Sequence, residues 1–254
     1  MNVLAIGDIV GDTGTDMFLE HIDGLKKQHN IDFCIVNAEN ASSNNGITRR
    51  KAELLLDSGA DVLTLGNHTF RQKDAFSLLA NNSRVIRPAN FPEGTVGKGV
   101  TVVEKNGKKI AVINLMGRIY MDYMDCPFKA VDKILKTVQA DYYFVDFHAE
   151  ATSEKISMGW HLDGRVTAVF GTHTHVQTAD GWVLPKGTGY ITDLGMTGPI
   201  YSCLGVKKEI TLERFISCIP RRFEFADGKA QLCGAVFAVG DDGKTEKVEA
   251  VCIR

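Results

Sequence analysis

The chain has no apolar run long enough to cross a membrane and no large excess of charge of either sign. A membrane-spanning helix needs roughly 20 consecutive apolar residues, and no apolar run in the sequence approaches that length. The formal net charge of −2 excludes a broad basic field of the kind that gathers nucleic acid or anionic lipid. The N-terminus lacks a basic segment and reaches Asp8 too soon for a signal peptide. We therefore expect a cytoplasmic, soluble protein that attracts any anion through a local feature.

The sequence also lacks a C-x-x-C pair. Its six cysteines are scattered, and most lie inside apolar runs such as "DFCIV" and "QLCGAVF". Because disulfide frameworks belong mainly to small secreted domains, we expect buried, reduced thiols. With 254 residues, of which 44% are hydrophobic and 24% charged, the chain is long enough to bury a substantial core.

Short apolar runs rich in Val, Ile, Leu and Phe recur along the chain, which is typical of strands buried on both faces. They lie at residues 2–7, 32–36, 61–66, 109–115, 141–147, 166–171 and 189–195. Helical apolar spacing and helix-start residues predict helices at 49–58, 71–81, 127–139 and 152–163. This alternation indicates an α/β fold with much parallel pairing.

Three Asn-Gly or Asp-Gly pairs lie between apolar stretches, a pattern that predicts β-hairpins. These stretches are residues 102–112, 223–232 and 239–248. We therefore expect antiparallel strands in the last forty residues. A mixed α/β sandwich fits this pattern better than a purely doubly wound sheet, and no linker or repeat divides residues 1–254, so one domain is expected.

Potential ligands and acid–base groups follow five of the predicted strands. Sites in α/β sheets assemble at the carboxyl ends of strands, so these side chains should converge. They are Asp8, Glu39 and Asn40 in "NAEN", Asn67 and His68 in "GNHTF", His148 and Glu150 in "FHAE", and His173 and His175 in "GTHTH". The three other histidines, His21, His29 and His161, are interpreted as surface or packing residues.

The residue types in these loops favour a catalytic metal site. In an extended segment His173 and His175 would point to the same side, and neutral imidazole is the commonest metal ligand in proteins. Carboxylate, amide oxygen and imidazole without thiolate suit Mn, Fe or Zn rather than a closed structural zinc site. The candidates exceed the need of one ion. Two ions about 3.5–4 Å apart that share a carboxylate would use them all.

Six segments in order carry a resemblance to a known family: "GDIVGDTG", "NAENAS", "GNHTF", "FHAEATSEK", "GWHLDGRV" and "GTHTHVQTAD". With them the sequence resembles the metallophosphoesterase (calcineurin-like) superfamily, and within it the YmdB-like branch of bacterial 2′,3′-cyclic-nucleotide phosphodiesterases. The superfamily's D-x-H opening is Asp8-Ile9-Val10 here and its GDxxD block is "NAEN", two departures that the YmdB-like branch shares. The resemblance implies an αββα sandwich of two mixed sheets flanked by helices.

The resemblance also implies a mechanism. Asp8, Glu39, Asn40 and His175 would hold one ion, and Glu39, Asn67, His148 and His173 the other. The implied ions are iron, with manganese or zinc as alternatives, and a hydroxide between them would attack a 2′,3′-cyclic nucleotide or an RNA end in line. His68 would stay unliganded and act as the general acid. The resemblance further implies self-association.

Other interpretations share much of this pattern. A phosphomonoesterase or nucleotidase of the same superfamily would use every ligand, and a regulatory scaffold could use the metal for stability alone. An amidohydrolase should carry its H-x-H pair on the first strand, not the sixth. Single residues also stay open: Glu150 either orients a ligand imidazole or lies on the surface, and Arg49, Arg50 and Arg118 either meet phosphate or are solvated.

Overall fold

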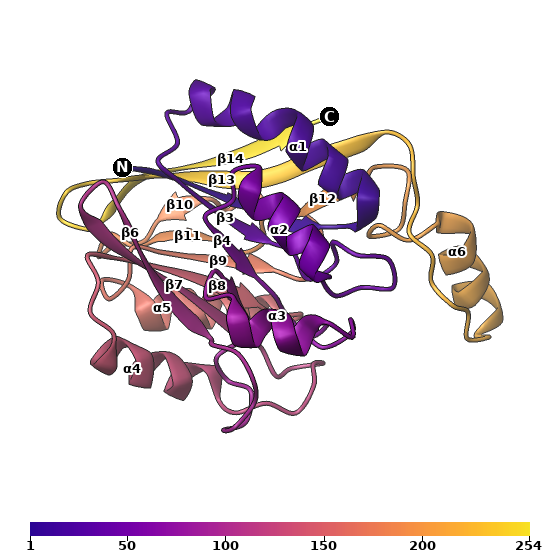
Figure 1. Ribbon diagram of the computed structural model, residues 1–254, viewed down its shortest axis with the longest axis horizontal. Coiled ribbons are helices and arrows are strands. Elements are labelled where there is room, and N and C mark those ends of the chain that lie inside the picture. The colour runs from indigo at the N-terminus through magenta and orange to yellow at the C-terminus, as the bar shows by residue number, and fades with distance from the viewer.

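Two mixed β-sheets packed face to face form the centre of the computed structural model, which describes residues 1–254 (Figure 1). The first sheet consists of β1 (Asn2–Ile6), β2 (Asp8–Ile9), β3 (Phe33–Asn37), β4 (Val62–Thr64), β5 (Val85–Ile86), β12 (Met196–Pro199), β13 (Ala230–Val239) and β14 (Thr245–Ile253). Its order is β2-β12-β13-β1-β3-β4-β5, with β14 paired to β13. Strands β1, β3, β4 and β5 are parallel, and β13 is antiparallel to β1.

The second sheet has six strands and a parallel centre. They are β6 (Val100–Lys105), β7 (Lys108–Met116), β8 (Tyr142–His148), β9 (Ala168–Thr172), β10 (Trp182–Val183) and β11 (Gly189–Ile191). Their order is β10-β11-β9-β8-β7-β6, in which β7, β8, β9 and β11 are parallel. Antiparallel strands close both edges of this sheet.

Helices cover the outer faces of both sheets. They are α1 (Gly11–Gln28), α2 (Arg49–Asp57), α3 (Ala75–Asn81), α4 (Pro127–Thr137), α5 (Thr152–Leu162) and α6 (Lys208–Ser217). The first three lie on the first sheet, α4 and α5 lie on the second, and α6 stands away from both (Figure 1). None of the six combines the length and apolar character that a bilayer crossing requires. The predicted αββα sandwich is confirmed.

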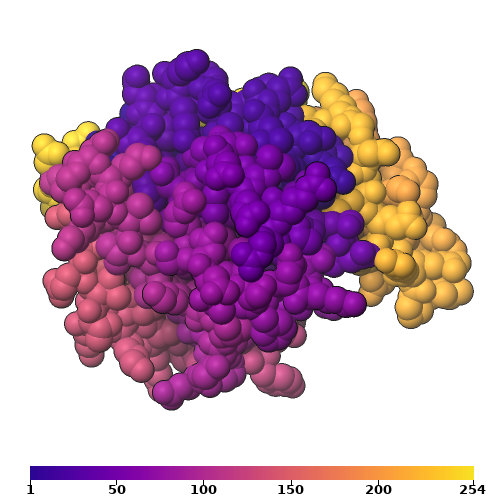
Figure 2. Space-filling view, in the orientation of Figure 1, coloured from indigo at the N-terminus to yellow at the C-terminus, as the bar shows by residue number.

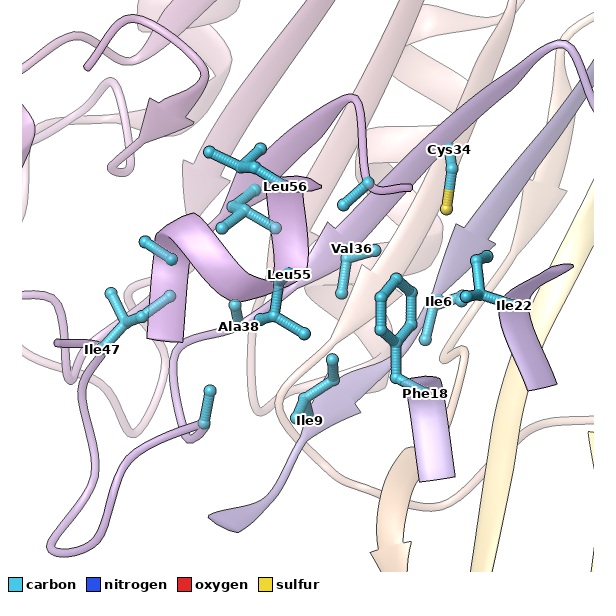
Figure 3. Packing of buried hydrophobic residues seen from close by; sticks show 14 of the residues in the cluster. Ile6, Ile9, Phe18, Ile22, Cys34, Val36, Ala38, Ile47, Leu55 and Leu56 are labelled. Carbon is cyan, nitrogen blue, oxygen red and sulfur yellow. The ribbon is translucent and has the colours of Figure 1, made fainter. Parts of the chain in front are cut away.

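Alternation along the strands divides the core into layers. In β1, Leu4 and Ile6 face the helices of the first sheet, whereas Val3 and Ala5 face the second sheet, because successive strand residues point to opposite sides. Figure 3 shows Phe18 and Ile22 of α1 packed near Ile6 in the outer layer. A third apolar layer lies beneath α4 and α5. The middle layer, shared by both sheets, fixes the strand ends that carry the site.

The hairpins predicted at 102–112 and 239–248 are confirmed as β6–β7 and β13–β14. The hairpin predicted at 223–232 is wrong. Phe225 forms a single antiparallel bridge with Val206 instead, and β13 begins only at Ala230. The expectation of antiparallel strands throughout the last forty residues is also wrong. Residues 224–226, which follow α6, lie outside the sheet and pair with residues 205–207 instead.

The prediction of buried thiols holds for only part of the set. Cys34 and Cys233 are buried in the first sheet, whereas Cys203, Cys218 and Cys252 are exposed. The exposed thiols lie in the loop before α6, at the end of α6 and on the outermost strand β14.

Candidate functional site

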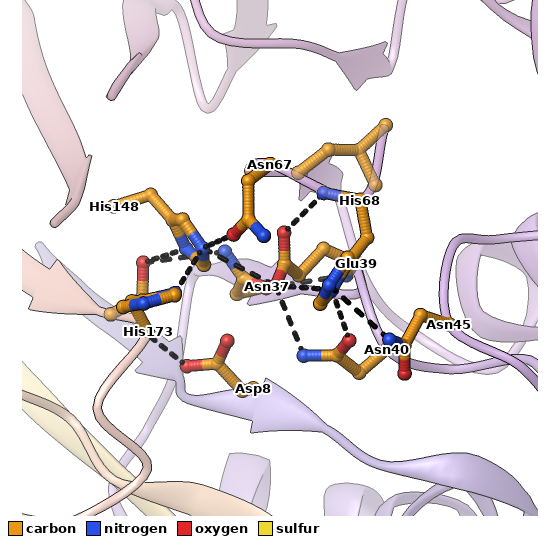
Figure 4. Close-up of polar contacts among 12 residues, drawn as sticks. Asp8, Asn37, Glu39, Asn40, Asn45, Asn67, His68, His148 and His173 are labelled. Atoms are coloured by element: carbon orange, nitrogen blue, oxygen red, sulfur yellow. Dashed lines mark hydrogen bonds and ion pairs between the residues drawn. The ribbon is translucent and has the colours of Figure 1, made fainter. Parts of the chain in front are cut away.

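The carboxyl ends of parallel strands from both sheets carry the side chains that Figure 4 shows close together. Strands β1, β3 and β4 supply these ends from the first sheet, and β8 and β9 supply them from the second. The structure brings together all eight side chains that the sequence singled out as ligands or acid: Asp8, Glu39, Asn40, Asn67, His68, His148, His173 and His175.

One group of donor atoms surrounds the ring of His148. Its Nε2 lies 3.0 Å from Asn67 Oδ1, 3.0 Å from His173 Nδ1 and 3.2 Å from Glu39 Oε1. Ligand atoms of Glu39, His148 and His173 all lie within 4.8 Å of one another. Imidazole nitrogen, carboxylate oxygen and amide oxygen around one point form a donor set that suits Mn, Fe or Zn.

A second group lies on the other side of Glu39. His175 Nε2 is 3.5 Å from Asp8 Oδ1 and 3.3 Å from the Asn40 amide nitrogen, which in turn donates to Glu39 Oε1 at 3.1 Å. Asp8 Oδ1 is buried and has no hydrogen-bond partner. A buried carboxylate oxygen without a hydrogen bond is costly, and a cation beside it would remove that cost. The residues present therefore fit a metal ion.

The charged side chains of the two groups shift one another's pKa values. Burial by itself would raise the pKa of Glu39, but the imidazoles of His148 and His68 hold it well below its usual value. Burial would lower the pKa of His148, but the carboxylates of Glu39, Asp8 and Asp146 raise it to about 9. His173 has its pKa lowered to about 3 by burial and by the charge on His148. Against the effect of burial, Asp8 likewise raises the pKa of His175, so His148 and His175 hold protons more tightly than His173 does.

A buried hydrogen-bond chain orients His148 from behind. The hydroxyl of Thr172 donates to Asp146 Oδ1 at 2.7 Å and lies 2.9 Å from His148 Nδ1. Because that hydroxyl proton is used on Asp146, Nδ1–H of His148 must donate to Thr172, which leaves Nε2 for the ligand group. Asn37 also donates to Asp146 at 3.0 Å, and burial raises the pKa of this carboxyl to about 6. This hydrogen-bond chain was not predicted, because its only signal in the sequence is a carboxylate inside the apolar run "DYYFVDF".

The His173–His175 turn is held in a strained backbone conformation. His173 has φ 95° and His175 has φ 63°, a region that side chains other than glycine rarely adopt. The expectation of an extended H-x-H segment is therefore wrong, because β9 ends at Thr172. Thr174 bonds to Asp193 at 2.6 Å, and His175 Nδ1 donates to the carbonyl of Leu204 at 3.0 Å.

A buried ion pair supports this turn. Lys155 Nζ lies 2.6 Å from Asp193 Oδ2, and the two side chains are 1% and 0% exposed. We expect Lys155→Met to lower the free energy of unfolding by about 3–5 kcal/mol, because it leaves the Asp193 carboxylate buried and unpaired. Urea unfolding followed by circular dichroism measures this change. Lys244→Met, at a side chain that is 63% exposed, is the control, and equal midpoints for both variants would contradict the expectation.

Two further side chains touch the ligand groups from the outside. His68 Nδ1 lies 2.8 Å from Asn40 Oδ1 and 3.1 Å from Glu39 Oε1, and its Nε2 lies 3.2 Å from the Asn45 amide nitrogen. Glu150 Oε2 lies 3.2 Å from His173 Nε2 while its side chain remains 48% exposed. Glu150 therefore contacts a candidate ligand and also faces solvent, and its role in orienting His173 stays a prediction.

A cavity of about 1010 Å³ opens over the site. Glu39, His68 and His175 lie in its wall, and so does the first turn of α1 from Gly11 to Thr13. Its arginines are Arg71 and Arg222, neither of which was predicted to meet phosphate. Three other arginines, for which the sequence left contact with phosphate open, lie outside this cavity: Arg49, Arg50 and Arg118.

Known proteins are similar to this chain in sequence and in fold. The sequence profile of a family described as "YmdB-like protein" matches residues 4–251. A 2′,3′-cyclic-nucleotide 2′-phosphodiesterase of Bacillus subtilis (strain 168) is 48% identical over 256 aligned positions, which cover 100% of this chain and 97% of the relative.

Two solved structures superpose closely on the whole chain. One, a hypothetical protein from Thermus thermophilus, has a TM-score of 0.95 at 41% identity and covers 100% of this chain and 99% of its own. The other, a novel phosphatase from Mycoplasma pneumoniae, has a TM-score of 0.95 at 35% identity, with coverage of 100% and 93%. The likeness therefore extends over both sheets and the loops between them.

Proposed function

Because the chain belongs to the YmdB-like family of metallophosphoesterases and is a phosphoesterase, we propose that it hydrolyses 2′,3′-cyclic nucleotides with a pair of metal ions. The observation that carries this proposal is the position of Glu39, whose carboxylate contacts both donor groups at once. The name of the Bacillus subtilis relative supports the substrate class. One domain spanning residues 1–254 would carry the whole activity. Self-association and a cytoplasmic location stay predictions.

We propose that one ion is held by Asp8, Glu39, Asn40 and His175, and the other by Glu39, Asn67, His148 and His173. Asp8 Oδ1, which lacks a hydrogen-bond partner, and the three ligand atoms around His148 Nε2 support these two sets. The resemblance to the family favours iron, with manganese or zinc as alternatives. Bound ions of this kind supply a water that is nucleophilic near neutral pH and positive charge that offsets the phosphate.

The chain's own residues would orient and protonate the substrate. Thr172 and the Leu204 carbonyl fix the rings of His148 and His175, so their Nε2 atoms face the cluster. His68 lies beside Glu39 and Asn40 with its side chain 19% exposed, which leaves it within reach of both the site and the cavity. In the proposed reaction His68 donates a proton to the sugar oxygen as the P–O bond breaks.

Metal binding should depend on pH through His148. Without metal, its pKa of about 9 means that this imidazole is protonated at neutral pH, and an ion must displace that proton. The apparent affinity should therefore rise by about tenfold per pH unit up to about pH 9 and level off above it. Titration calorimetry with Mn²⁺ at several pH values, in buffers of different ionisation enthalpy, should show proton release near neutral pH that falls off above about pH 9. An affinity that stays constant between about pH 6.5 and 8.5 would contradict this role of His148.

Parallel assays test the function itself. Protein reconstituted with Fe, Mn or Zn is offered 2′,3′-cyclic AMP, bis-p-nitrophenyl phosphate and a 5′-nucleotide, and its metal content is measured alongside. The proposal expects the cyclic diester to give the highest kcat/KM. Preference for the 5′-nucleotide would identify a phosphomonoesterase, and metal binding without turnover of any substrate would favour a regulatory scaffold.

A further inference from the structure

The cavity over the site has two chemically different sides. All five hydrophobic residues in its lining come from one segment, 204–226, and we call them the apolar wall: Leu204, Val206, Phe223, Phe225 and Ala226. The opposite side is polar and consists of the ligand loops and the first turn of α1. Figure 2 shows residues after 200, in orange and yellow, beside the indigo and violet N-terminal part.

We propose that the apolar wall is the base-binding side of the site, with Phe223 as the stacking platform for a nucleobase. This inference rests on the proposed function, because it assumes that a phosphodiester occupies the polar side. A phosphate gains nothing from an apolar surface, whereas every nucleobase has a flat face that stacks on aromatic rings. A ligand that fills both sides must therefore carry a charged end and a flat, weakly polar end, which describes a nucleotide.

Contacts to the site hold the apolar wall in place. The carbonyl of Leu204 accepts from His175 Nδ1 at 3.0 Å, so the wall begins at a candidate ligand. Val206 bridges to Phe225, and the amide of Ala226 donates to Gly205 at 2.8 Å. Phe225 packs so closely on Gly11 that a Cβ there would lie 3.0 Å from its ring. The wall is thus fixed relative to the ligand loops rather than hanging free.

The surroundings of Phe223 suit a stacking role. The ring remains 44% exposed and lines the cavity. The guanidinium of Arg214 lies 4.9 Å from its centroid, which braces the ring from α6. Next to it, Arg222 donates to Asn44 Oδ1 at 2.7 Å. This contact links the segment that carries the wall to the loop after β3, and both residues line the cavity with polar groups that can meet the edge of a base.

Two substrates that differ only in the base test this inference. Reconstituted wild-type protein and Phe223→Ala are compared on 2′,3′-cyclic AMP and on ribose 2′,3′-cyclic phosphate. Phe223→Ala should raise KM for the cyclic nucleotide by roughly tenfold, the loss of one base–aromatic stack, with kcat unchanged. KM for the ribose compound should not move, because that substrate has no base to lose. Phe223→Tyr should restore the wild-type values, and Phe215→Ala, on α6 at a ring 77% exposed and outside the cavity lining, is the control.

Binding of adenosine 3′-monophosphate, measured by calorimetry, separates this inference from the proposed function. If neither cyclic phosphate is turned over, the proposed function fails, but weaker binding of this nucleotide to Phe223→Ala than to wild type and Phe215→Ala would still support the base site. Equal loss on both cyclic substrates would assign Phe223 a purely structural role and overturn the inference. Unchanged KM and unchanged nucleotide binding would overturn it as well.

Discussion

Glu39→Gln is expected to reduce kcat/KM on 2′,3′-cyclic AMP by about a thousandfold or more and to reduce the metal content below two ions per chain. Glu39 is 1% exposed and contacts Asn40, His68 and His148, so no other carboxylate can replace it between the two donor groups. The amide keeps the shape but removes the charge that would hold both cations. Metal ions contribute several kcal/mol to transition-state stabilisation, and each 1.36 kcal/mol is a factor of ten in rate.

The measurement combines steady-state kinetics with elemental analysis of the same sample. Glu53→Gln makes the same chemical change on the exposed face of α2 and should leave both quantities at wild-type values. Circular dichroism establishes that each variant is folded. If Glu39→Gln kept two ions and full turnover, the carboxylate would not join the two groups, and the proposed metal sets would have to be rebuilt.

His68→Ala is expected to give the second largest effect, a loss of about 10²–10⁴-fold in kcat on 2′,3′-cyclic AMP, with the metal content unchanged. The loss in kcat reflects the missing proton donor. The metal content should stay unchanged because His68 contacts Glu39 and Asn40 but belongs to neither proposed ligand set. The loss should be smaller on bis-p-nitrophenyl phosphate, since p-nitrophenolate is a stable anion and leaves without a proton. A role in metal binding predicts the opposite pattern, in which both substrates suffer equally and ions are lost.

Two histidine variants frame this experiment. His148→Ala removes the ring at the centre of one donor group and should lose metal together with activity on every substrate. His21→Ala, on α1 and away from the cavity, should change nothing. If His68→Ala lost the same activity on both esters and kept its metals, proton donation to the leaving oxygen would have to come from another group.

The ligand loops could be predicted from the sequence because the signal for them is local. Each apolar run marks a strand, and the polar residue that follows it marks the carboxyl end, as for Asp8 after β1 and Asn67 after β4. Parallel pairing then forces such positions to one edge. The resemblance to a known family added which side chains share an ion, and that assignment stays a prediction.

The supports of the site could not be predicted in this way, because they depend on contacts between distant parts of the chain. Lys155 reads as an ordinary residue of an amphipathic helix until α5 is placed against Asp193. Asp146 reads as an interruption of an apolar strand until Thr172 and Asn37 are seen around it. Single-residue patterns carry no information about such partners.

The segment between Ile200 and Lys229 was predicted least well. Asp227-Gly228 has the composition of a hairpin turn, but the residues before it pair with Val206 and reach Asn44 through Arg222. The local preference for a hairpin was overruled by these contacts. Because of this error the apolar side of the cavity was not predicted. The sequence therefore predicted chemistry at the phosphate but no surface for the rest of the substrate.

The proposed ligand sets take members from both halves of the sandwich. Asp8, Glu39, Asn40 and Asn67 lie just after β1, β3 and β4 of the eight-stranded sheet, whereas His148 ends β8 and His173 and His175 follow β9 of the six-stranded sheet. Cations bound between them would cross-link the two sheets and oppose movement of one sheet relative to the other. Removal of the metal by a chelator would then lower the thermal stability of the protein as well as its activity. The melting temperature would rise with metal concentration. Catalysis and mechanical cohesion would rest on the same few bonds.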